Sequence, residues 1–188
     1  MTEANCHPHT STDGRFAVVH NGIIENYAEL KTFLQEKGYR FYGQTDTEVA
    51  VKMFEYLFTG DDFETLKLLK EHIEGAYALV FLDREHPGRI FGAKLGSPLV
   101  IGIGKDETYV SSDYRSLIGI ATEYITLEDG DIFLIENGRY RIENQGVEIV
   151  REKESITEEE RTFELGDFPH FMLKEIHEQP EVLRNVFA

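Results

Sequence analysis

The residues best suited to covalent chemistry lie near the start of the chain. Cys6 is the only cysteine, and His7 and His9 follow it on either side of a proline. Thiol catalysis needs a lowered pKa and a base held beside the sulfur, and adjacency in sequence supplies neither. A zinc site would need further ligands at fixed geometry, and the remaining histidines are scattered without ligand spacing. We therefore expect Cys6 to be an incidental loop thiol, and we expect no metal site.

Asn21, Gly22 and Asp46 are the other candidates for a functional site. Glycine lets a ligand approach the backbone closely, and an asparagine amide can donate to a developing negative oxygen. An ordinary turn from a strand to a helix accounts for Asn21 and Gly22 equally well. Asp46 is also ambiguous, because a carboxylate at that position either interacts favourably with a helix dipole or binds a substrate ammonium.

A dinucleotide cofactor is not expected from the glycines of this chain. Gly102-Ile103-Gly104 lacks the third glycine and the following helix of a dinucleotide-binding loop, so we interpret it as a turn between strands. No other pattern indicates a cofactor.

The elements that must position these residues follow from the hydrophobic pattern. A short strand over residues 15–20 is predicted to end in a turn at Asn21–Gly22, and helices are predicted over residues 26–38, 45–60 and 63–73. Asn26 with Glu29, and Thr45 with Glu48, have the spacing of capping boxes. Residues 40–42 are predicted to form a brief strand between the first two helices.

The second half of the chain has the pattern of a β-meander. Runs of β-branched and aromatic residues, bounded by turn pairs, predict strands over residues 76–83, 89–93, 99–103, 108–111, 124–127, 131–135, 140–142 and 147–150. A short helix is predicted over residues 113–119. Because this half lacks crossover helices, the pattern favours a layered α+β domain with antiparallel sheets.

The end of the chain is more polar. Residues 151–161 are dense in charge and are predicted to form a surface linker. Residues 168–186 are amphipathic, but Pro180 lacks a backbone donor and should end or kink a helix near Gln179.

Composition narrows the class of protein. A chain of 188 residues with 13 Phe and 9 Tyr has enough apolar area to fold as one domain or a compact pair. The net charge of −16 argues against a cluster of positive charge that could bind nucleic acid or an anionic membrane surface. No apolar run approaches the ~18 residues of a spanning helix. One cysteine fits a reducing compartment, so we expect a cytoplasmic protein that binds neither nucleic acid nor membrane.

Longer motifs resemble a known family. These are Asn5-Cys6-His7-Pro8-His9, Val18-Val19-His20-Asn21-Gly22-Ile23-Ile24-Glu25-Asn26-Tyr27, Gly43-Gln44-Thr45-Asp46-Thr47-Glu48-Val49, Gly96-Ser97-Pro98-Leu99-Val100-Ile101-Gly102 and His170-Phe171-Met172-Leu173-Lys174-Glu175-Ile176-His177-Glu178-Gln179-Pro180. They are similar to the glutamine amidotransferase domain of glucosamine-6-phosphate synthases, over nearly the whole chain. The first half also suits other N-terminal-nucleophile amidotransferases, such as the phosphoribosylpyrophosphate enzyme, whereas the last motif points to the sugar-phosphate branch.

The resemblance implies a fold, a reaction and roles for particular residues. The fold would be a four-layer α-β-β-α sandwich of antiparallel sheets, incomplete at the N-terminus, with a glutamine amidotransferase domain over residues 1–165. A linker helix over residues 166–188 would lead to an absent sugar-isomerising domain. In the family, an N-terminal cysteine hydrolyses glutamine and the ammonia converts fructose 6-phosphate into glucosamine 6-phosphate. Asn21 and Gly22 would form the oxyanion hole, and Asp46 would bind the α-ammonium of L-glutamine.

The departures from the family pattern lead to a second expectation. Cys6 stands where the family usually has alanine, so it is not the nucleophile, and the family's leading cysteine and arginine-containing carboxylate loop are not among these residues. We therefore expect the chain alone to be inactive, with an incomplete glutamine site. A non-catalytic glutamine-binding or assembly module is the alternative. Missing strands would leave exposed sheet edges, so homo-oligomers are also expected.

Overall fold

The computed structural model describes residues 2–156 and 168–186. The chain divides into two compact units, Met1–Ser155 and Ile156–Ala188, which are described separately below. The domain boundary predicted between residues 165 and 166 lies outside the described residues.

The three predicted helices are present in the first unit. They are α1 (Tyr27–Glu36), α2 (Asp46–Leu57) and α3 (Asp62–His72), and short 3-10 turns occur at Glu3–Asn5 and Tyr114–Leu117. At the start of α2 the Thr45 hydroxyl accepts the backbone N–H of Glu48 at 3.2 Å, as the capping-box spacing predicts. The Glu48 carboxylate does not complete the box, because it accepts the N–H groups of Tyr42 and Gly43.

The strands form two antiparallel sheets. The larger sheet contains, in spatial order, β1 (His9–Thr10), β2 (Phe16–Ile24), β3 (Gly75–Asp83), β4 (Arg89–Leu95), β8 (Ile132–Glu136), β9 (Arg139–Asn144) and β10 (Val147–Ile149). The smaller sheet contains β11 (Glu154–Ser155), β7 (Glu123–Thr126), β5 (Val100–Ile103) and β6 (Thr108–Ser111). The predicted α+β sandwich of antiparallel sheets is confirmed.

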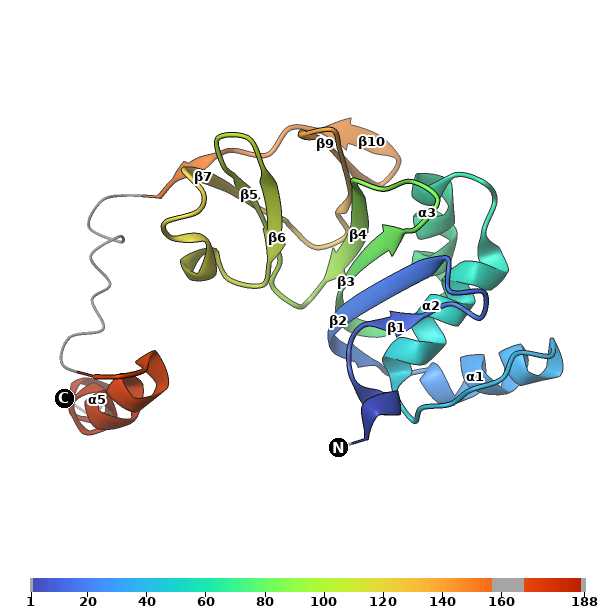
Figure 1. Cartoon of the computed structure of the whole chain (residues 1–188), viewed down its shortest axis with the longest axis horizontal. Helices are drawn as coiled ribbons and strands as arrows, with labels where there is room; N and C mark the ends of the chain where they lie inside the picture. The colour runs from blue at the N-terminus through green and yellow to red at the C-terminus, as the bar shows by residue number, and fades with distance from the viewer. Residues whose placement is uncertain (1, 157–167, 187–188) are drawn as a thin grey trace. The chain divides into compact units, whose positions relative to one another are not determined.

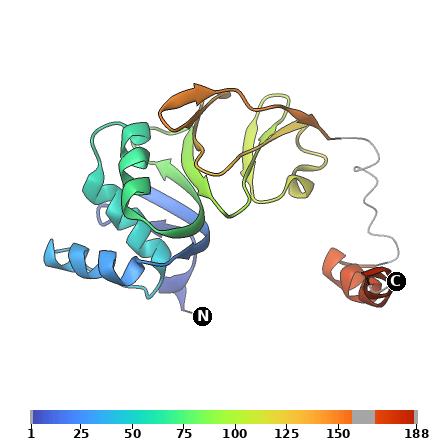
Figure 2. The same cartoon turned by 180° about the vertical axis from the view of Figure 1, so that it is seen from behind.

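The larger sheet lies between helices α1, α2 and α3 and the smaller sheet (Figures 1 and 2). Side chains alternate along β3, as expected for a strand buried on both faces. Tyr77, Leu79 and Phe81 pack in the core that includes α1, α2 and α3, and Ala78 packs in a second core with residues of β5 and β7. Residues 2–155 therefore form three layers, in the order helices α1–α3, larger sheet and smaller sheet.

The predicted turn at Asn21–Gly22 is wrong, because β2 continues through both residues to Ile24. Asn21 lies opposite Ala78 and Gly22 lies opposite Tyr77 in an unbroken antiparallel register. The extended partner strand β3 begins at Gly75 and supplies pairing as far as Ile24. The apolar residues Ile23 and Ile24, which follow the glycine, therefore belong to the strand.

The strand predicted over residues 40–42 is also absent among the described elements. The backbone groups of this segment bind side chains of α2 instead of another strand. The N–H of Tyr42 donates to Glu48, and the carbonyl of Arg40 accepts a hydrogen bond from the Lys52 ammonium. These partners satisfy the backbone without a sheet, so local β-propensity did not decide the conformation.

The C-terminal segments also differ from expectation. The charged segment from Arg151 is not a free linker at its start, because the Arg151 guanidinium binds Asp131 and β11 pairs with β7. Residues 157–161 of that predicted linker lie outside the described residues.

Helix α5 (Phe171–Val186) continues through Pro180. The proline removes one backbone donor, but the residues around it, Glu178, Gln179 and Glu181, favour helix. Among the described helices, none has the length and apolar character needed to cross a membrane.

Candidate functional site

Gly22 occupies a place in β2 that no larger residue could take. Its φ of +122° is a backbone conformation that L side chains rarely adopt. A Cβ atom built on Gly22 would lie 2.1 Å from the carbonyl oxygen of Ala76 and 2.8 Å from the hydroxyl of Ser97. The sheet therefore requires glycine here, and the adjacent backbone is left open to close approach.

One edge of β2 is open beside these residues. β1 pairs with β2 only at Val18 and Ala17, so this edge has no neighbouring strand beyond Val18 within residues 2–156. Further along, the N–H of Ile24 donates to Oδ2 of Asp46 at 2.9 Å. Two residues of strand span roughly 6.6–6.8 Å, so Gly22 lies about that far along the strand from the Asp46 contact.

Asp46 has the position that the first of its two predicted roles requires, and its exposure leaves the second role open. It is the first residue of α2, where a carboxylate interacts favourably with the helix dipole. Its Oδ1 accepts the N–H of Thr47 at 2.9 Å while Oδ2 accepts the N–H of Ile24. The side chain is 22% exposed, so the carboxylate is fixed in direction but still open to a ligand.

A set of histidines surrounds the start of α2. His7 Nε2 lies 3.2 Å from the Thr47 hydroxyl, and His20 Nδ1 lies 3.1 Å from the same oxygen. His9 Nε2 lies 3.0 Å from the hydroxyl of Thr45. Burial lowers the pKa of His20, although the nearby Asp46 carboxylate opposes this effect. Burial likewise lowers the pKa of His9, so both rings favour the neutral form.

A cavity of about 150 Å³ opens beside Asn21, between the two sheets. Val19, Ala78 and Leu99 line its apolar part, and polar groups come from Asn21, His7, Ser111 and Ser112. The cavity is therefore small, and both polar and apolar side chains line it.

Cys6 lies outside this cavity. Its side chain is exposed, and its thiol lies 3.5 Å from the carbonyl oxygen of Thr2. It lines a different cavity, whose other residues include Glu48 and Lys52. Cys6, His7 and His9 do not converge into a metal-ligating group in the described part of the chain.

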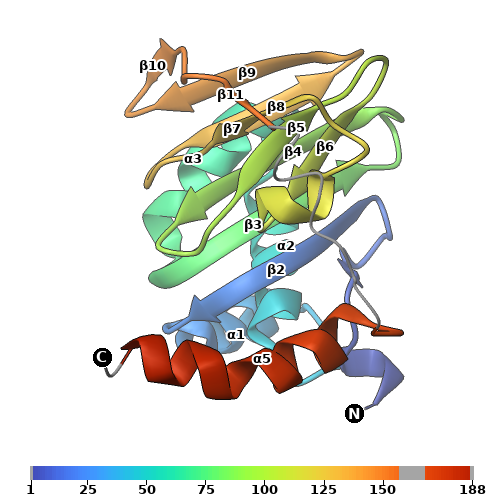
Figure 3. The same cartoon turned by 90° about the vertical axis from the view of Figure 1, so that its left-hand side faces the viewer.

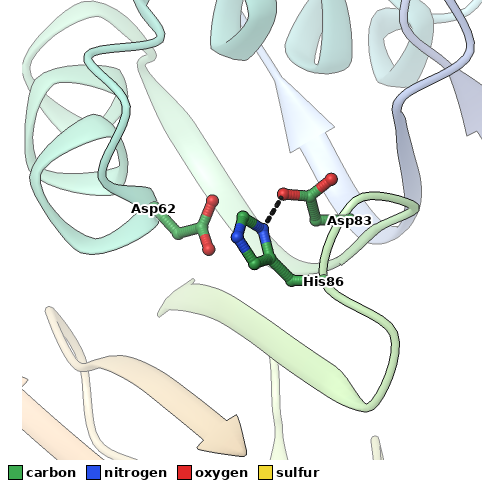
Figure 4. Close-up of side chains that lie close together, drawn as sticks. All are labelled: Asp62, Asp83 and His86. Carbon is green, nitrogen blue, oxygen red and sulfur yellow. Dashed lines mark hydrogen bonds and ion pairs between the residues drawn. The ribbon is translucent and has the colours of Figure 1, made fainter.

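A second cluster, Asp62, Asp83 and His86, has donor atoms close enough together to suit a metal ion (Figure 4). Both carboxylates are already engaged by arginines: Arg15 binds Asp83 through two nitrogens, and Arg89 binds Asp62 at 2.7 Å. Burial would raise the pKa of Asp83, but hydrogen bonds from Arg15 and His86 hold it at about 2. This network ties the start of β2 to the end of β3, and the start of α3 to the start of β4.

The structure thus brings together the three residues that the sequence singled out. Asn21 and Gly22 lie on β2, and Asp46 reaches the same strand through Ile24. The sequence pattern gave no role to His20 or Thr47, and it considered His7 only as a partner of Cys6. The positions of His20 and Thr47 in the sequence could have indicated a role, because His20 directly precedes Asn21 and Thr47 directly follows Asp46. No spacing rule, however, predicts the contact between His20 and Thr47, which are 27 positions apart.

Comparisons with known proteins show which family the chain resembles. A profile of the glutamine amidotransferase domain family matches residues 1–119. The chain is 42% identical over 186 residues to a glutamine–fructose-6-phosphate aminotransferase (isomerizing) of Bacteroides thetaiotaomicron, covering 96% of this chain and 30% of the relative. It is also 42% identical over its full length to the Thermus thermophilus enzyme of that name, of which it covers 31%. The chain therefore spans about three-tenths of the length of these relatives.

Solved structures share the fold. A glutamine phosphoribosylpyrophosphate amidotransferase from B. subtilis superposes with a TM-score of 0.67 and 24% identity, covering 76% of this chain and 32% of that one. A glutamine aminotransferase class-II domain protein from Silicibacter pomeroyi has a TM-score of 0.52 and 13% identity, covering 74% of this chain and 71% of that one. Because the family profile matches well over half of its residues, the chain belongs to the glutamine amidotransferase domain family.

Proposed function

We propose that these residues are the glutamine-binding part of a glutamine–fructose-6-phosphate aminotransferase. In this proposal Asp46 binds the α-ammonium of L-glutamine, while the side-chain amide of Asn21 and the backbone N–H of Gly22 stabilise the oxyanion formed at the substrate amide. The observation that carries the proposal is the hydrogen bond from Ile24 to Asp46, which holds the carboxylate beside the strand that contains Gly22.

The spacing on β2 supports this pose. The α-ammonium and the side-chain amide of glutamine are separated by a short chain of methylenes. Gly22 and the Asp46 contact are separated by two strand residues, roughly 6.6–6.8 Å. A ligand lying along the open edge of β2 could therefore reach both groups at once. The low mobility of a paired strand suits an oxyanion hole, because such donors work best when they are fixed before the reaction.

The proposal assigns the attacking group to a residue outside these 188. The exposed Cys6 lines a cavity different from the one beside Asn21, and this separation supports excluding it as the nucleophile. In the family resemblance, the nucleophile is a cysteine of a leading segment. Ammonia released there would be passed to a sugar-isomerising domain, making glucosamine 6-phosphate from fructose 6-phosphate.

The sugar-phosphate branch is favoured over the phosphoribosylpyrophosphate branch by sequence similarity. The relatives named glutamine–fructose-6-phosphate aminotransferase are 42% identical to this chain, whereas the solved phosphoribosylpyrophosphate amidotransferase is 24% identical. The fold is common to both, so the fold alone does not separate them.

Ammonia release from glutamine tests the assignment of the catalytic groups. The 188-residue chain is expected to give no release above background, and Cys6→Ala should change nothing. If the 188-residue chain releases ammonia and Cys6→Ala abolishes that release, the proposal is contradicted.

The same chain, extended at its start with the relatives' cysteine-bearing segment, is expected to release ammonia. Asn21→Ala in the extended protein should lower that rate by on the order of 10²–10³-fold, because one oxyanion donor is lost. Gln35→Ala, which removes an exposed amide on α1, is the matched control and should leave the rate unchanged. Equal rates for Asn21→Ala and Gln35→Ala would show that Asn21 is not an oxyanion donor.

A further inference from the structure

The Thr47 hydroxyl is the point where three segments of the candidate site meet. It lies 3.1 Å from Nδ1 of His20 on β2, 3.2 Å from Nε2 of His7 in the N-terminal loop, and 3.4 Å from Oδ1 of Asp46 on α2. Thr47 is 2% exposed, so water does not compete for these contacts. The helix that carries Asp46 and the strand that carries Asn21 are therefore joined through one oxygen atom.

The chemistry of the three partners determines the direction of each hydrogen bond. A hydroxyl has one proton to donate and two lone pairs that accept. Because the Asp46 carboxylate is an acceptor only, the hydroxyl donates to it, and both imidazoles must donate to the hydroxyl. His20 then carries its proton on Nδ1, and His7 carries a proton on Nε2. This assignment uses every hydrogen-bonding position of the Thr47 hydroxyl.

The surroundings of His20 agree with that assignment. Its ring is buried, and its Nε2 has no hydrogen-bond partner in the described structure. A proton on this nitrogen would be buried without an acceptor, which is costly, so Nε2 is the nitrogen left bare. Nδ1 also lies 3.8 Å from Oδ2 of Asp46, so a proton at Nδ1 is electrostatically favoured.

We propose that Thr47 is a positioning residue, whose hydroxyl sets the Asp46 carboxylate and the Asn21–Gly22 segment at the separation that glutamine requires. This inference rests on the proposed function, because it gives Thr47 a role in that same glutamine site. Thr47 itself does not touch the substrate. It acts through Asp46 on one side and through His20, the residue next to Asn21, on the other.

Two substitutions at this position separate the hydroxyl from the shape of the side chain. Thr47→Val keeps the branched shape and removes the hydroxyl, whereas Thr47→Ser keeps the hydroxyl. Titration of each ¹⁵N-labelled protein with L-glutamine, followed by amide chemical shifts, measures the dissociation constant even when binding is weak. Thr47→Val is expected to weaken binding about tenfold, and Thr47→Ser is expected to restore it to within about twofold of wild type.

A second variant and a second readout keep the test independent of folding and of glutamine. His7 is exposed, so His7→Ala removes one of the three contacts without opening the core, and it should weaken binding about threefold. Hydrogen exchange at the Ile24 amide should be faster in Thr47→Val than in wild type and unchanged in Thr47→Ser. The His20 imidazole ¹⁵N shifts in wild type should be those of the Nδ1–H form.

The outcomes distinguish the positioning role of Thr47 from the proposed glutamine-binding function. If wild type binds glutamine and Thr47→Val binds it equally well, the positioning role is wrong while the proposed function stands. If neither the 188-residue chain nor the protein extended with the relatives' cysteine-bearing segment shows glutamine-dependent shifts, the proposed function is wrong. The Ile24 exchange rates then decide whether Thr47 couples the helix to the strand, and equal rates in wild type and Thr47→Val would overturn that coupling.

Discussion

Gly22 and Asp46 illustrate what single residues contribute to this site. The sequence marked both as ambiguous, since glycine suits a turn or a close approach and an aspartate suits a helix start or a ligand. Gly22 lies inside a strand with a φ of +122°, and Asp46 both begins α2 and accepts the N–H of Ile24. Local rules identified these residues, but they could not decide between the roles, because the deciding contacts come from Ala76 and Ile24.

The close contact between Gly22 and the Ala76 carbonyl oxygen can be tested by substitution. Gly22→Ala would place a methyl group 2.1 Å from the Ala76 carbonyl oxygen, so we expect it to lower the free energy of unfolding by on the order of 3 kcal/mol. The matched control is Gly38→Ala, which has a φ of +92° but no atom within 4 Å of the added carbon. It should cost only about 1 kcal/mol. If urea unfolding gives equal losses of unfolding free energy for Gly22→Ala and Gly38→Ala, the close contact with the Ala76 carbonyl oxygen is not what requires glycine at position 22.

At the scale of elements, the capping pattern at Asn26 predicts where helix α1 begins but not which hydrogen bonds the Asn26 side chain makes. The spacing of Asn26 and Glu29 predicted a capping box, and α1 does begin at Tyr27. The Asn26 side chain makes no capping hydrogen bond there. Its amide instead donates to the carbonyl of His72 at 2.8 Å, and its oxygen accepts the N–H of Glu74 at 3.0 Å. The residue therefore joins the start of α1 to the end of α3, a contact that spacing alone could not indicate.

Replacement of Asn26 by aspartate tests this tertiary role. Asp is as good a helix cap as Asn, so a capping function would leave stability nearly unchanged. Because Asp cannot donate to the His72 carbonyl and would place a charge beside it, we expect Asn26→Asp to cost about 1–2 kcal/mol in the free energy of unfolding. Chemical denaturation measures this directly. A cost below a few tenths of a kcal/mol would favour the capping role.

At the scale of the whole first unit, the two sheets do not cover each other completely. In Figure 3 the strands of the smaller sheet lie over β3, β4 and β8, and β2 lies beyond them. On β2, Val19 is 43% exposed and Ile23 is 66% exposed. The sequence predicted most strands individually. It could not predict which strands the second sheet covers, because pairs such as β4 with β8 join segments far apart in the chain.

The uncovered face leads to a prediction about association. We expect the mass of the chain, measured by light scattering, to rise with protein concentration, because exposed apolar sheet surface favours contacts between copies. Val19→Lys with Ile23→Lys should reduce that rise. Val150→Lys is the control, since Val150 is 92% exposed and follows β10, at the opposite edge of the larger sheet from β1 and β2. A constant monomer mass up to high concentration, or an equal effect of the control, would contradict the prediction.

The central claim is that Asn21, Gly22 and Asp46 form one glutamine site. The most direct measurement is an amide chemical-shift titration of the ¹⁵N-labelled chain with L-glutamine, alongside Asp46→Asn and the exposed control Asp106→Asn. We expect saturable shifts at the backbone amides of Gly22 and Ile24 and at the side-chain amide of Asn21. These shifts should be lost in Asp46→Asn and retained in Asp106→Asn. Shifts that survive Asp46→Asn, or that occur elsewhere in the chain but not on β2, would contradict this claim.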